Sequence, residues 1–334
     1  MQVSKKLFTS LMSQVVTTIT RSYRVTVVGG SSELGQTVCL LLRAQPSITR
    51  LNVHDTLIQT PGVILDLSHI PAESYLKGYV GEETLERALK GSDIVIAAGG
   101  LVNRPGISNE AWMATNTNFI KMLVRKVAKI SPLPMVGILT DPVNVLVPMA
   151  AEVMRNSGEY DAKKLFGITT VDHLRAQSLY ATENNLPARG CIVPVIGGRS
   201  GKTAIPLLSQ AKPKCQMNEK AIQEFTSKFQ KCDENIREAK KGWSASLSVA
   251  YGALMFTRSI IDALDGRPAK VAAFVENNDF GSHYFSGTIN INHHGVTDMQ
   301  RFTDLSEYEC HLLERSIAQI RQDVLKGKKI LELA

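Results

Sequence analysis

The feature that most constrains the fold is a glycine-rich turn between a strand and a helix. Residues 24–28, Arg-Val-Thr-Val-Val, form a short β-branched run that breaks into Gly-Gly-Ser-Ser-Glu-Leu-Gly at 29–35. A helical pattern follows, with apolar side chains at Val38, Leu41 and Leu42. A strand, a glycine turn and a helix in this order are typical of the first βα unit of a parallel sheet. The sequence therefore predicts one half of a doubly wound α/β domain.

The same alternation continues downstream. A second strand at 50–54 ends at Asp55, twenty residues after Gly35. Further short apolar strands are predicted at 94–98 and 135–139, with helical patterns between them. Strands that alternate with helices indicate a parallel, Rossmann-type doubly wound sheet.

The second half of the chain has a different pattern. We place a boundary near residue 165, which gives a dinucleotide-binding domain at 23–165 and a mixed α+β substrate domain at 166–334. The elements expected in the second domain are a helix that contains Asp172 and Arg175, a strand at 191–196, a long helical pattern over 219–264, an antiparallel pair at 271–275 and 284–291, and a charged closing helix at 306–326.

Composition excludes several classes of protein. The chain has 334 residues, of which 44% are apolar and 21% charged, as in ordinary globular proteins. Its five cysteines form no CxxC pair, so we expect free thiols and no metal site. The net charge of +7 permits weak polyanion binding, but no long basic run with interleaved aromatic residues is present, so nucleic acid is not an expected partner. No apolar run approaches the length of a membrane span, which predicts no membrane insertion.

Residues 1–22 form a separate segment. No acidic residue occurs before Glu33, whereas Lys5, Lys6 and Arg21 are basic, and an apolar stripe recurs at helical spacing from Leu7. Such a segment is typical of a transit peptide and predicts the mitochondrial matrix, with a cytoplasmic location as the alternative. The alternative is a plain N-terminal extension before the first strand.

A set of ordered motifs resembles one family, the mitochondrial-type, NAD-dependent malate dehydrogenases. The resemblance covers residues 24–327 and implies NAD as cofactor, a 2-hydroxy or 2-oxo acid as substrate, and a homodimer with contacts near 65–70 and 164–175. The motifs are Thr-Pro-Gly-Val at 60–63, Asp-Leu-Ser-His-Ile at 66–70, Pro-Val-Asn at 142–144, Phe-Gly-Ile-Thr-Thr at 166–170, residues 194–203, and residues 244–251.

The resemblance implies a set of cofactor-binding residues. The family's three turn glycines correspond to Gly29, Ser32 and Gly35, so the middle glycine is replaced, and a Cβ there hinders close approach of a pyrophosphate. Asp55 matches the residue that holds the adenosine ribose, and Asn116 completes the set. We therefore expect NAD binding that is weakened but retained.

Glu33 lies beside the replaced glycine and allows two interpretations. Its carboxylate would repel a bound phosphate by about 3 kcal/mol at ~5 Å and an effective dielectric constant of ~20, before screening by salt. It is also an ordinary acidic residue for the first turn of a helix.

The substrate loop departs from the family. The family pairs substrate carboxylates with three arginines, because a planar guanidinium binds a carboxylate through two hydrogen bonds. Two of those positions are Asn103 and Asn109 here, and only Arg175 remains. Arg104 lies between the two asparagines, where no side-chain contact with substrate is implied.

The catalytic position departs further. The family's proton-accepting histidine corresponds to Arg199, and an arginine cannot be deprotonated near neutral pH. Asp172, which orients that histidine in the family, is expected to pair with Arg199, and Asp141 to join them. Asp141 replaces an asparagine that contacts the reacting oxygen, and Trp243 replaces a small residue, where it either fills the cavity or packs between helices.

No histidine replaces the lost base. His173 follows Asp172 in a helix, so the two side chains point about 100° apart. The other candidates lie in parts of the family fold away from the nicotinamide or lack a carboxylate partner: His54, His69, His293 and His294.

These observations predict a catalytically impaired malate-dehydrogenase-like body retained for binding or scaffolding, with a protein partner still to be identified. The alternative is an active NAD-dependent dehydrogenase of malate or another 2-hydroxy acid with altered specificity. A third hypothesis is a polyanion binder, which depends on net charge alone.

Overall fold

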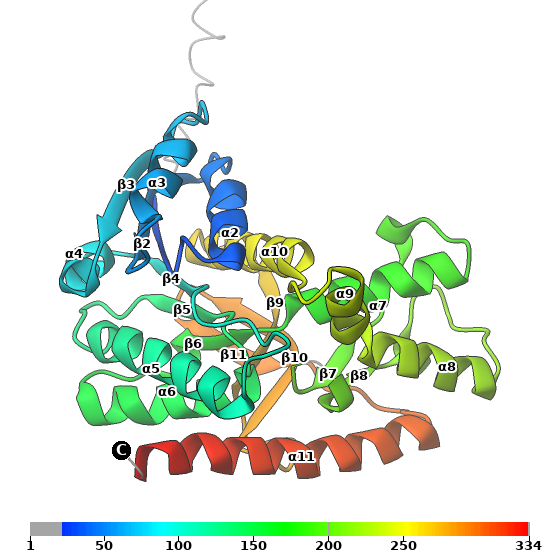
Figure 1. Cartoon of the computed structure of the whole chain (residues 1–334). Helices are drawn as coiled ribbons and strands as arrows, with labels where there is room; N and C mark the ends of the chain where they lie inside the picture. The colour runs from blue at the N-terminus through cyan, green and yellow to red at the C-terminus, as the bar shows by residue number, and fades with distance from the viewer. Residues whose placement is uncertain (1–21, 200, 333–334) are drawn as a thin grey trace, which may run out of the picture.

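The structure is a computed structural model that describes residues 22–199 and 201–332. One sheet of eleven strands runs through the described part of the chain (Figure 1). The strand order is β3-β2-β1-β4-β5-β6-β9-β10-β7-β8, and β11 pairs with β10. The proposed transit segment, residues 1–22, lies outside the described residues except for Ser22.

The first six strands form the predicted parallel sheet. Their order, β3-β2-β1-β4-β5-β6, is that of a doubly wound dinucleotide-binding fold, which confirms the predicted fold class. The strands are β1 (Tyr23–Val28), β2 (Ile48–Asp55), β3 (Tyr75–Val80), β4 (Ile94–Ala97), β5 (Met135–Ile138) and β6 (Leu165–Ile168). The helices between them are α2 (Glu33–Arg43), α3 (Thr60–Ser68), α4 (Leu85–Leu89), α5 (Asn109–Val127) and α6 (Val143–Ser157).

The second half adds antiparallel strands and long helices. The predicted antiparallel pair is present as β9 and β10, and β6 joins it to the parallel strands. The strands are β7 (Val195–Gly197), β8 (Ala204–Pro206), β9 (Ala269–Glu276), β10 (Tyr284–Asn292) and β11 (Gly295–Met299). The helices are α7 (Thr170–Glu183), α8 (Glu219–Gln230), α9 (Cys232–Ala239), α10 (Ser246–Leu264) and α11 (Glu307–Glu332), with single 3₁₀ turns at Glu82–Thr84, Ala162–Lys164, Ala188–Gly190, Gly201–Thr203 and Leu208–Gln210.

Helices cover both faces of the sheet. In Figure 1, α2 and α10 lie together on one face, whereas α5, α6 and α11 lie on the other. The central strands β4 and β5 are fully buried four-residue apolar runs, as expected for parallel strands covered on both sides.

Three predictions of elements were wrong in detail. The pattern over 219–264 is three helices: Lys231 separates α8 from α9, and left-handed backbone at Lys241 (φ +53°) and Gly242 (φ +98°) separates α9 from α10. The strand predicted at 191–196 is only β7, preceded by an isolated bridge from Ile192 to Lys212. Strand β3 was not predicted, because its edge position leaves most side chains partly exposed.

Helix α10 is long and apolar enough to cross a membrane by length and composition alone, with a mean hydropathy of 1.3. In the fold it packs against α2, α7 and β9, and half of its apolar 18-residue stretch is buried. Such packing is typical of a core helix.

Candidate functional site

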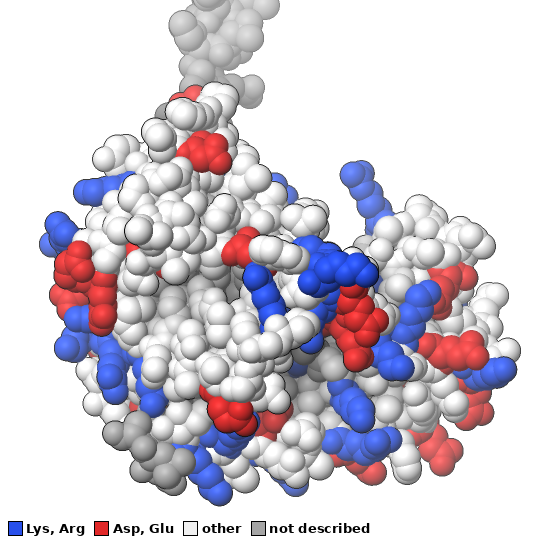
Figure 2. Space-filling view, viewed as in Figure 1, with Lys and Arg blue, Asp and Glu red and all other residues white. Residues whose placement is uncertain are grey.

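A large cleft opens at the carboxyl ends of β1, β4 and β5. Its volume is about 1040 Å³, and its walls come from the glycine turn, the loop after β4, the start of α6 and the segment before α10. Ligands of doubly wound sheets bind at this edge, which makes the cleft the candidate site. Basic and acidic side chains are interspersed on the face seen in Figure 2, so no single-sign surface that would favour a polyanion appears there.

The turn between β1 and α2 requires two of its glycines. Gly29 has a φ of +81°, and a Cβ on it would lie 2.1 Å from the Cα of Gly99. A Cβ on Gly35 would lie 2.0 Å from the carbonyl oxygen of Gly29. These contacts hold the helix start against the strand, as a dinucleotide-binding turn requires.

Ser32 has a structural role in the same turn. It is the N-cap of α2: its Oγ accepts a hydrogen bond from the Gly35 backbone at 2.9 Å and donates one to the Ala98 carbonyl at 2.7 Å. The serine thus satisfies a backbone amide at the helix start, the position where the family's glycine leaves room for phosphate.

Asp55 ends β2 and Asn116 lies in α5, and both side chains bind backbone. The Asp55 carboxylate accepts hydrogen bonds from the backbone nitrogens of Ser31 at 2.9 Å and Thr56 at 2.7 Å. The buried Asn116 amide accepts from the Leu101 nitrogen at 2.6 Å and donates to the Asp141 carbonyl at 2.7 Å. Asn116 therefore fixes the start of the loop after β4 relative to the end of β5.

Four buried or half-buried charged residues form an ion-pair cluster at the substrate side of the cleft, and two of them, Arg199 and Asp233, line it. The predicted ion pair is present: Arg199 Nη1 lies 3.0 Å from Asp172 Oδ1. The same nitrogen lies 3.3 Å from Asp233 Oδ2, and Arg175 Nη2 lies 2.5 Å from Asp233 Oδ1. Arg175 Nη1 also lies 3.5 Å from Asp172. Two guanidinium groups and two carboxylates thus balance one another without a substrate carboxylate.

The electrostatics of this cluster keep Arg199 charged. Burial alone would lower the pKa of Arg199, but Asp172, Asp233 and Asp141 raise it above the usual value. Burial alone would raise the pKa of Asp233, but Arg199 and Arg175 lower it. Arg199 is a permanent cation here and cannot accept a proton.

Asp141 does not join the cluster through an ion pair, contrary to the prediction. Among the described residues, no cation lies within ion-pair distance of its carboxylate, and Asp233 takes the expected place. Asp141 lines the cleft, where desolvation raises the pKa of its carboxyl, with the charges of Asp233 and Asp172 adding and that of Arg199 opposing. The side chain keeps contact with solvent, which limits the rise.

The loop after β4 brings only some of the predicted substrate-binding residues to the cleft. Asn103 lines the cleft, whereas Asn109 is the exposed first residue of α5 and does not line it. Arg104 forms an ion pair with Glu33 at 3.1 Å, and its guanidinium lies 4.0 Å from the centre of the Trp243 ring. Lys240 lies 3.5 Å from the other Glu33 oxygen.

These contacts bear on the roles of Glu33 and Trp243, for each of which the sequence left two interpretations. Glu33 is more than an ordinary first-turn residue, since two cations from separate segments meet its carboxylate. Trp243 neither fills the cavity nor packs between helices: its side chain lines the cleft, is 49% exposed and stacks on Arg104.

The histidines stay outside the cleft. The backbone nitrogen of Val195 donates to His173 Nε2 at 3.3 Å, and burial lowers the pKa of His173 to about 4. His54 contacts the Gly81 carbonyl, and burial lowers its pKa as well. Within residues 22–199 and 201–332, no group of three His, Cys, Asp or Glu side chains is arranged to hold a metal ion.

The sequence did not indicate Asp233 or Lys240 as site residues. Both belong to a charged stretch that is typical of a solvated helix face. Asp233 gains its partners only from the position of α9 against α7 and the turn after β7, and Lys240 gains its ion-pair partner only from the start of α2. No motif or spacing in the sequence marks this packing.

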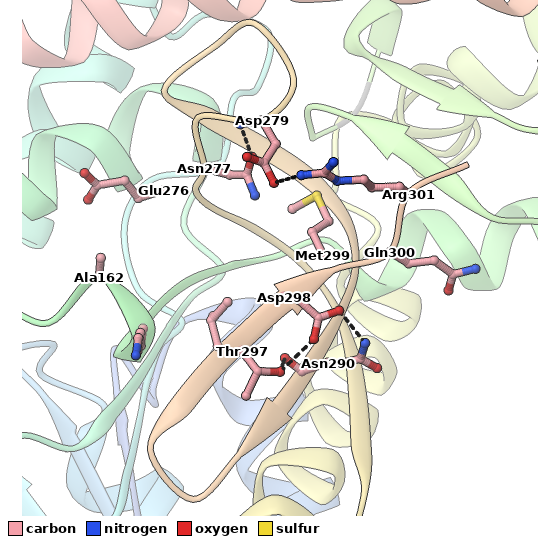
Figure 3. Close-up of a pocket in the computed structure, with 12 residues that line it drawn as sticks. Ala162, Glu276, Asn277, Asp279, Asn290, Thr297, Asp298, Met299, Gln300 and Arg301 are labelled. Carbon is pink, nitrogen blue, oxygen red and sulfur yellow. Dashed lines mark hydrogen bonds and ion pairs between the residues drawn. The ribbon is translucent and has the colours of Figure 1, made fainter. Parts of the chain in front are cut away.

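A second cavity, of about 640 Å³, lies beside β10 and β11 (Figure 3). Its polar side chains pair with one another: Arg301 with Asp279 at 2.8 Å, and Asn290 with Asp298 at 2.7 Å. Because these groups satisfy each other, this cavity is the weaker candidate.

Known proteins are similar to this chain over nearly its whole length. Residues 23–167 match the model of the lactate/malate dehydrogenase NAD-binding domain, and residues 169–331 match that of the lactate/malate dehydrogenase alpha/beta C-terminal domain. A mitochondrial malate dehydrogenase of Citrullus lanatus is 36% identical over 306 residues, which are 91% of this chain and 88% of the relative. A malate dehydrogenase of Haemophilus influenzae is 37% identical over 310 residues, which are 92% of this chain and 99% of the relative.

Solved structures agree on the fold. A malate dehydrogenase from Cryptosporidium parvum has a TM-score of 0.79 at 21% identity, with 92% of this chain and 100% of that chain covered. Together with the matched domains and the glycine turn, these relatives establish that the chain belongs to the lactate/malate dehydrogenase family and carries its NAD-binding domain.

Proposed function

We propose that this chain is a malate-dehydrogenase-like body with little or no malate turnover, kept for binding or scaffolding. The observation that carries the proposal is the Arg199 ion pair with Asp172 and Asp233, because it places a permanent cation where the family needs a proton acceptor. Loss of a general base reduces the rate by roughly 10²–10⁴, about 3–5 kcal/mol of barrier.

The substrate side supports the same proposal. Arg175, the one remaining substrate arginine, already binds the Asp233 carboxylate at 2.5 Å. Asn103 and Asn109 supply no positive charge, and Asp141 adds a carboxyl group that opposes an incoming carboxylate. A dicarboxylate would therefore have to compete with Asp233 for Arg175 and Arg199.

The cofactor side of the cleft fits NAD in part. Gly29, Gly35 and Asp55 keep the turn and the acidic residue of a dinucleotide site, and the cleft has room for the cofactor. When bound, NAD would supply hydride acceptance. Ser32 and the Glu33 carboxylate stand where the pyrophosphate would approach, so we infer weak binding.

One observation favours the second candidate, an active dehydrogenase with a different 2-hydroxy or 2-oxo acid. Asp141 is a cleft carboxyl with a raised pKa, and such groups serve as proton donors and acceptors in other enzymes. In this second candidate, Asp141 accepts or donates the proton of the substrate hydroxyl. Arg175 or Arg199 holds the substrate carboxylate after Asp233 has moved away.

A kinetic experiment separates the two candidates. NADH oxidation is followed with oxaloacetate and with a panel of 2-oxo acids of neutral and cationic tails, using the wild type and Asp141→Asn. The impaired-body proposal expects no substrate-dependent oxidation in either protein. Turnover by the wild type that Asp141→Asn abolishes would establish the second candidate instead.

Three further proposals concern the whole protein. We infer a homodimer, an additional protein partner, and a mitochondrial matrix location with residues 1–22 as a transit peptide. Both mitochondrial and bacterial relatives are similar to the chain, so the location depends on the N-terminal segment. We also keep the domain boundary near residue 165, at the start of β6.

A further inference from the structure

Residues 231–245, which comprise α9 and the connection to α10, form one wall of the cleft. None of the eight residues of α9 is buried, and all eight are described. Figure 2 shows basic and acidic side chains gathered over this part of the molecule. Apolar burial therefore contributes little to holding α9 in place.

The first end of this segment is fixed by charge. The carboxylate of Asp233 contacts Arg175 at 2.5 Å and Arg199 at 3.3 Å, and the side chains of these two arginines are only 9% and 4% exposed. Arg175 Nε is also buried without a hydrogen-bond acceptor among the described residues, so Asp233 does not satisfy all the donors of this guanidinium. A carboxylate that approached from the cleft could compete with Asp233 for Arg199, which lines the cleft, and for Arg175 once Asp233 has moved away.

The second end is fixed to the cofactor side. Lys240 pairs with Glu33 at 3.5 Å, and Arg104, which also pairs with Glu33, stacks on Trp243. The loop after β4 also packs against the segment, since a Cβ on Gly242 would lie 3.2 Å from Pro105. The segment, this loop and the helix start are thus joined through the Glu33 carboxylate.

We propose that residues 231–245 are a strap across the cleft, held at each end by an internal carboxylate that occupies the place of a ligand anion. Asp233 stands in for a ligand carboxylate at one end, and Glu33 for a ligand phosphate at the other. A ligand with an anionic group at either end competes with the internal carboxylate and loosens the strap. Only this ligand step depends on the proposed dinucleotide binding; the strap itself does not.

Hydrogen–deuterium exchange of the full chain tests the strap without any ligand. A helix of eight residues is marginal alone, so α9 freed from its ion pairs should lose amide protection. Asp233→Asn is expected to speed exchange over residues 232–245 by at least about tenfold and Lys240→Gln by up to about fivefold, with β5 unchanged. Raising the salt from about 0.05 M to about 1 M should speed exchange in the same segment, because the Lys240 pair is partly exposed.

Glu86→Gln is the matched control, because it removes the exposed ion pair of Glu86 with Lys126, outside the cleft. It should leave strap exchange unchanged. Lys240→Gln is the decisive variant, since its partly exposed side chain can be replaced without disturbing the core, whereas Asp233→Asn leaves two buried arginines short of a partner. Exchange in Lys240→Gln equal to that of the wild type at both salt concentrations would overturn the strap.

Titration with NADH tests the ligand step. Glu33→Gln should bind NADH about tenfold more tightly than the wild type, and added NADH should speed strap exchange in the wild type. Equal NADH affinity of the two proteins would overturn the competition by Glu33. Absence of NADH binding to both proteins would overturn the proposed NADH binding. The hydrogen–deuterium exchange of Lys240→Gln would still test the strap, because that experiment uses no ligand.

Discussion

At the residue scale, the proposed loss of malate turnover depends mainly on Arg199, which lies where the family resemblance implies a proton-accepting histidine. The guanidinium satisfies Asp172 as an imidazolium would, but its charge is permanent. The sequence alone predicted this pair, since both positions lie in recognisable motifs. It could not predict Asp233, because that carboxylate reaches Arg199 only through the packing of α9.

Arg199→Ala should destabilise the fold. The change leaves Asp172 and Asp233 with Arg175 as their remaining guanidinium partner, and loss of one member of a buried ion pair costs about 3–5 kcal/mol. Urea denaturation measures the free energy of unfolding. Arg301→Ala, which removes an exposed pair with Asp279, should cost less than about 1 kcal/mol. Equal stability of Arg199→Ala and the wild type would show that the cluster contributes nothing.

His173 should make stability depend on pH. Its pKa in the folded chain is about 4, below the ordinary 6.5, so the unfolded chain binds the proton more readily. Stability should therefore be complete above about pH 6.5 and fall as the pH drops toward 4, by at most about 3 kcal/mol. His173→Gln should flatten this slope in denaturation experiments at several pH values. An unchanged slope would assign the effect to other groups.

At the element scale, strong local patterns predicted the fold and weak ones failed. The glycine turn and the apolar strands β1, β2, β4 and β5 are set by short sequences, and the structure has them within a few residues. The break between α9 and α10 was missed because left-handed backbone at Lys241 interrupts an otherwise helical pattern. Local propensity cannot reveal an edge strand such as β3, whose pairing with β2 supplies its order.

Ser32→Gly should lower the stability of the fold and raise the affinity for NADH. The serine caps α2, and its loss should cost a few tenths of a kcal/mol to about 1 kcal/mol. The same change removes the Cβ from the pyrophosphate approach, so NADH should bind more tightly in calorimetry. Asn218→Gly removes an equivalent cap from α8, which does not line the cleft, and should lower stability without changing NADH affinity. Weaker NADH binding by Ser32→Gly would contradict this view of the turn.

At the scale of the whole molecule, an apolar surface supports the proposed homodimer. Exposed large apolar side chains occur on three adjoining helices: Leu40 on α2, Leu65 on α3, and Leu247 and Tyr251 on α10. Side chains of this size on one connected group of helices favour association.

Leu247→Glu should convert the dimer to a monomer. The side chain is 69% exposed in the single chain, so a charge there leaves the monomer folded but disfavours a covered interface. Analytical ultracentrifugation of the wild type and the variant measures the mass. Leu325→Glu, at an exposed position of α11, is the matched control and should remain dimeric. A monomeric wild type would refute the homodimer.

The proposed function requires that this member of the family has lost malate turnover while keeping a cofactor cleft. The most direct test follows NADH by fluorescence on titration into the full chain, and then its absorbance after oxaloacetate is added, for the wild type and Arg199→His. We expect weak NADH binding and no oxidation in either protein, because Asn103, Asn109, Asp141 and Asp233 all remain unsuited to a dicarboxylate. Oxaloacetate-dependent oxidation by the wild type, or its recovery through Arg199→His alone, would contradict the account.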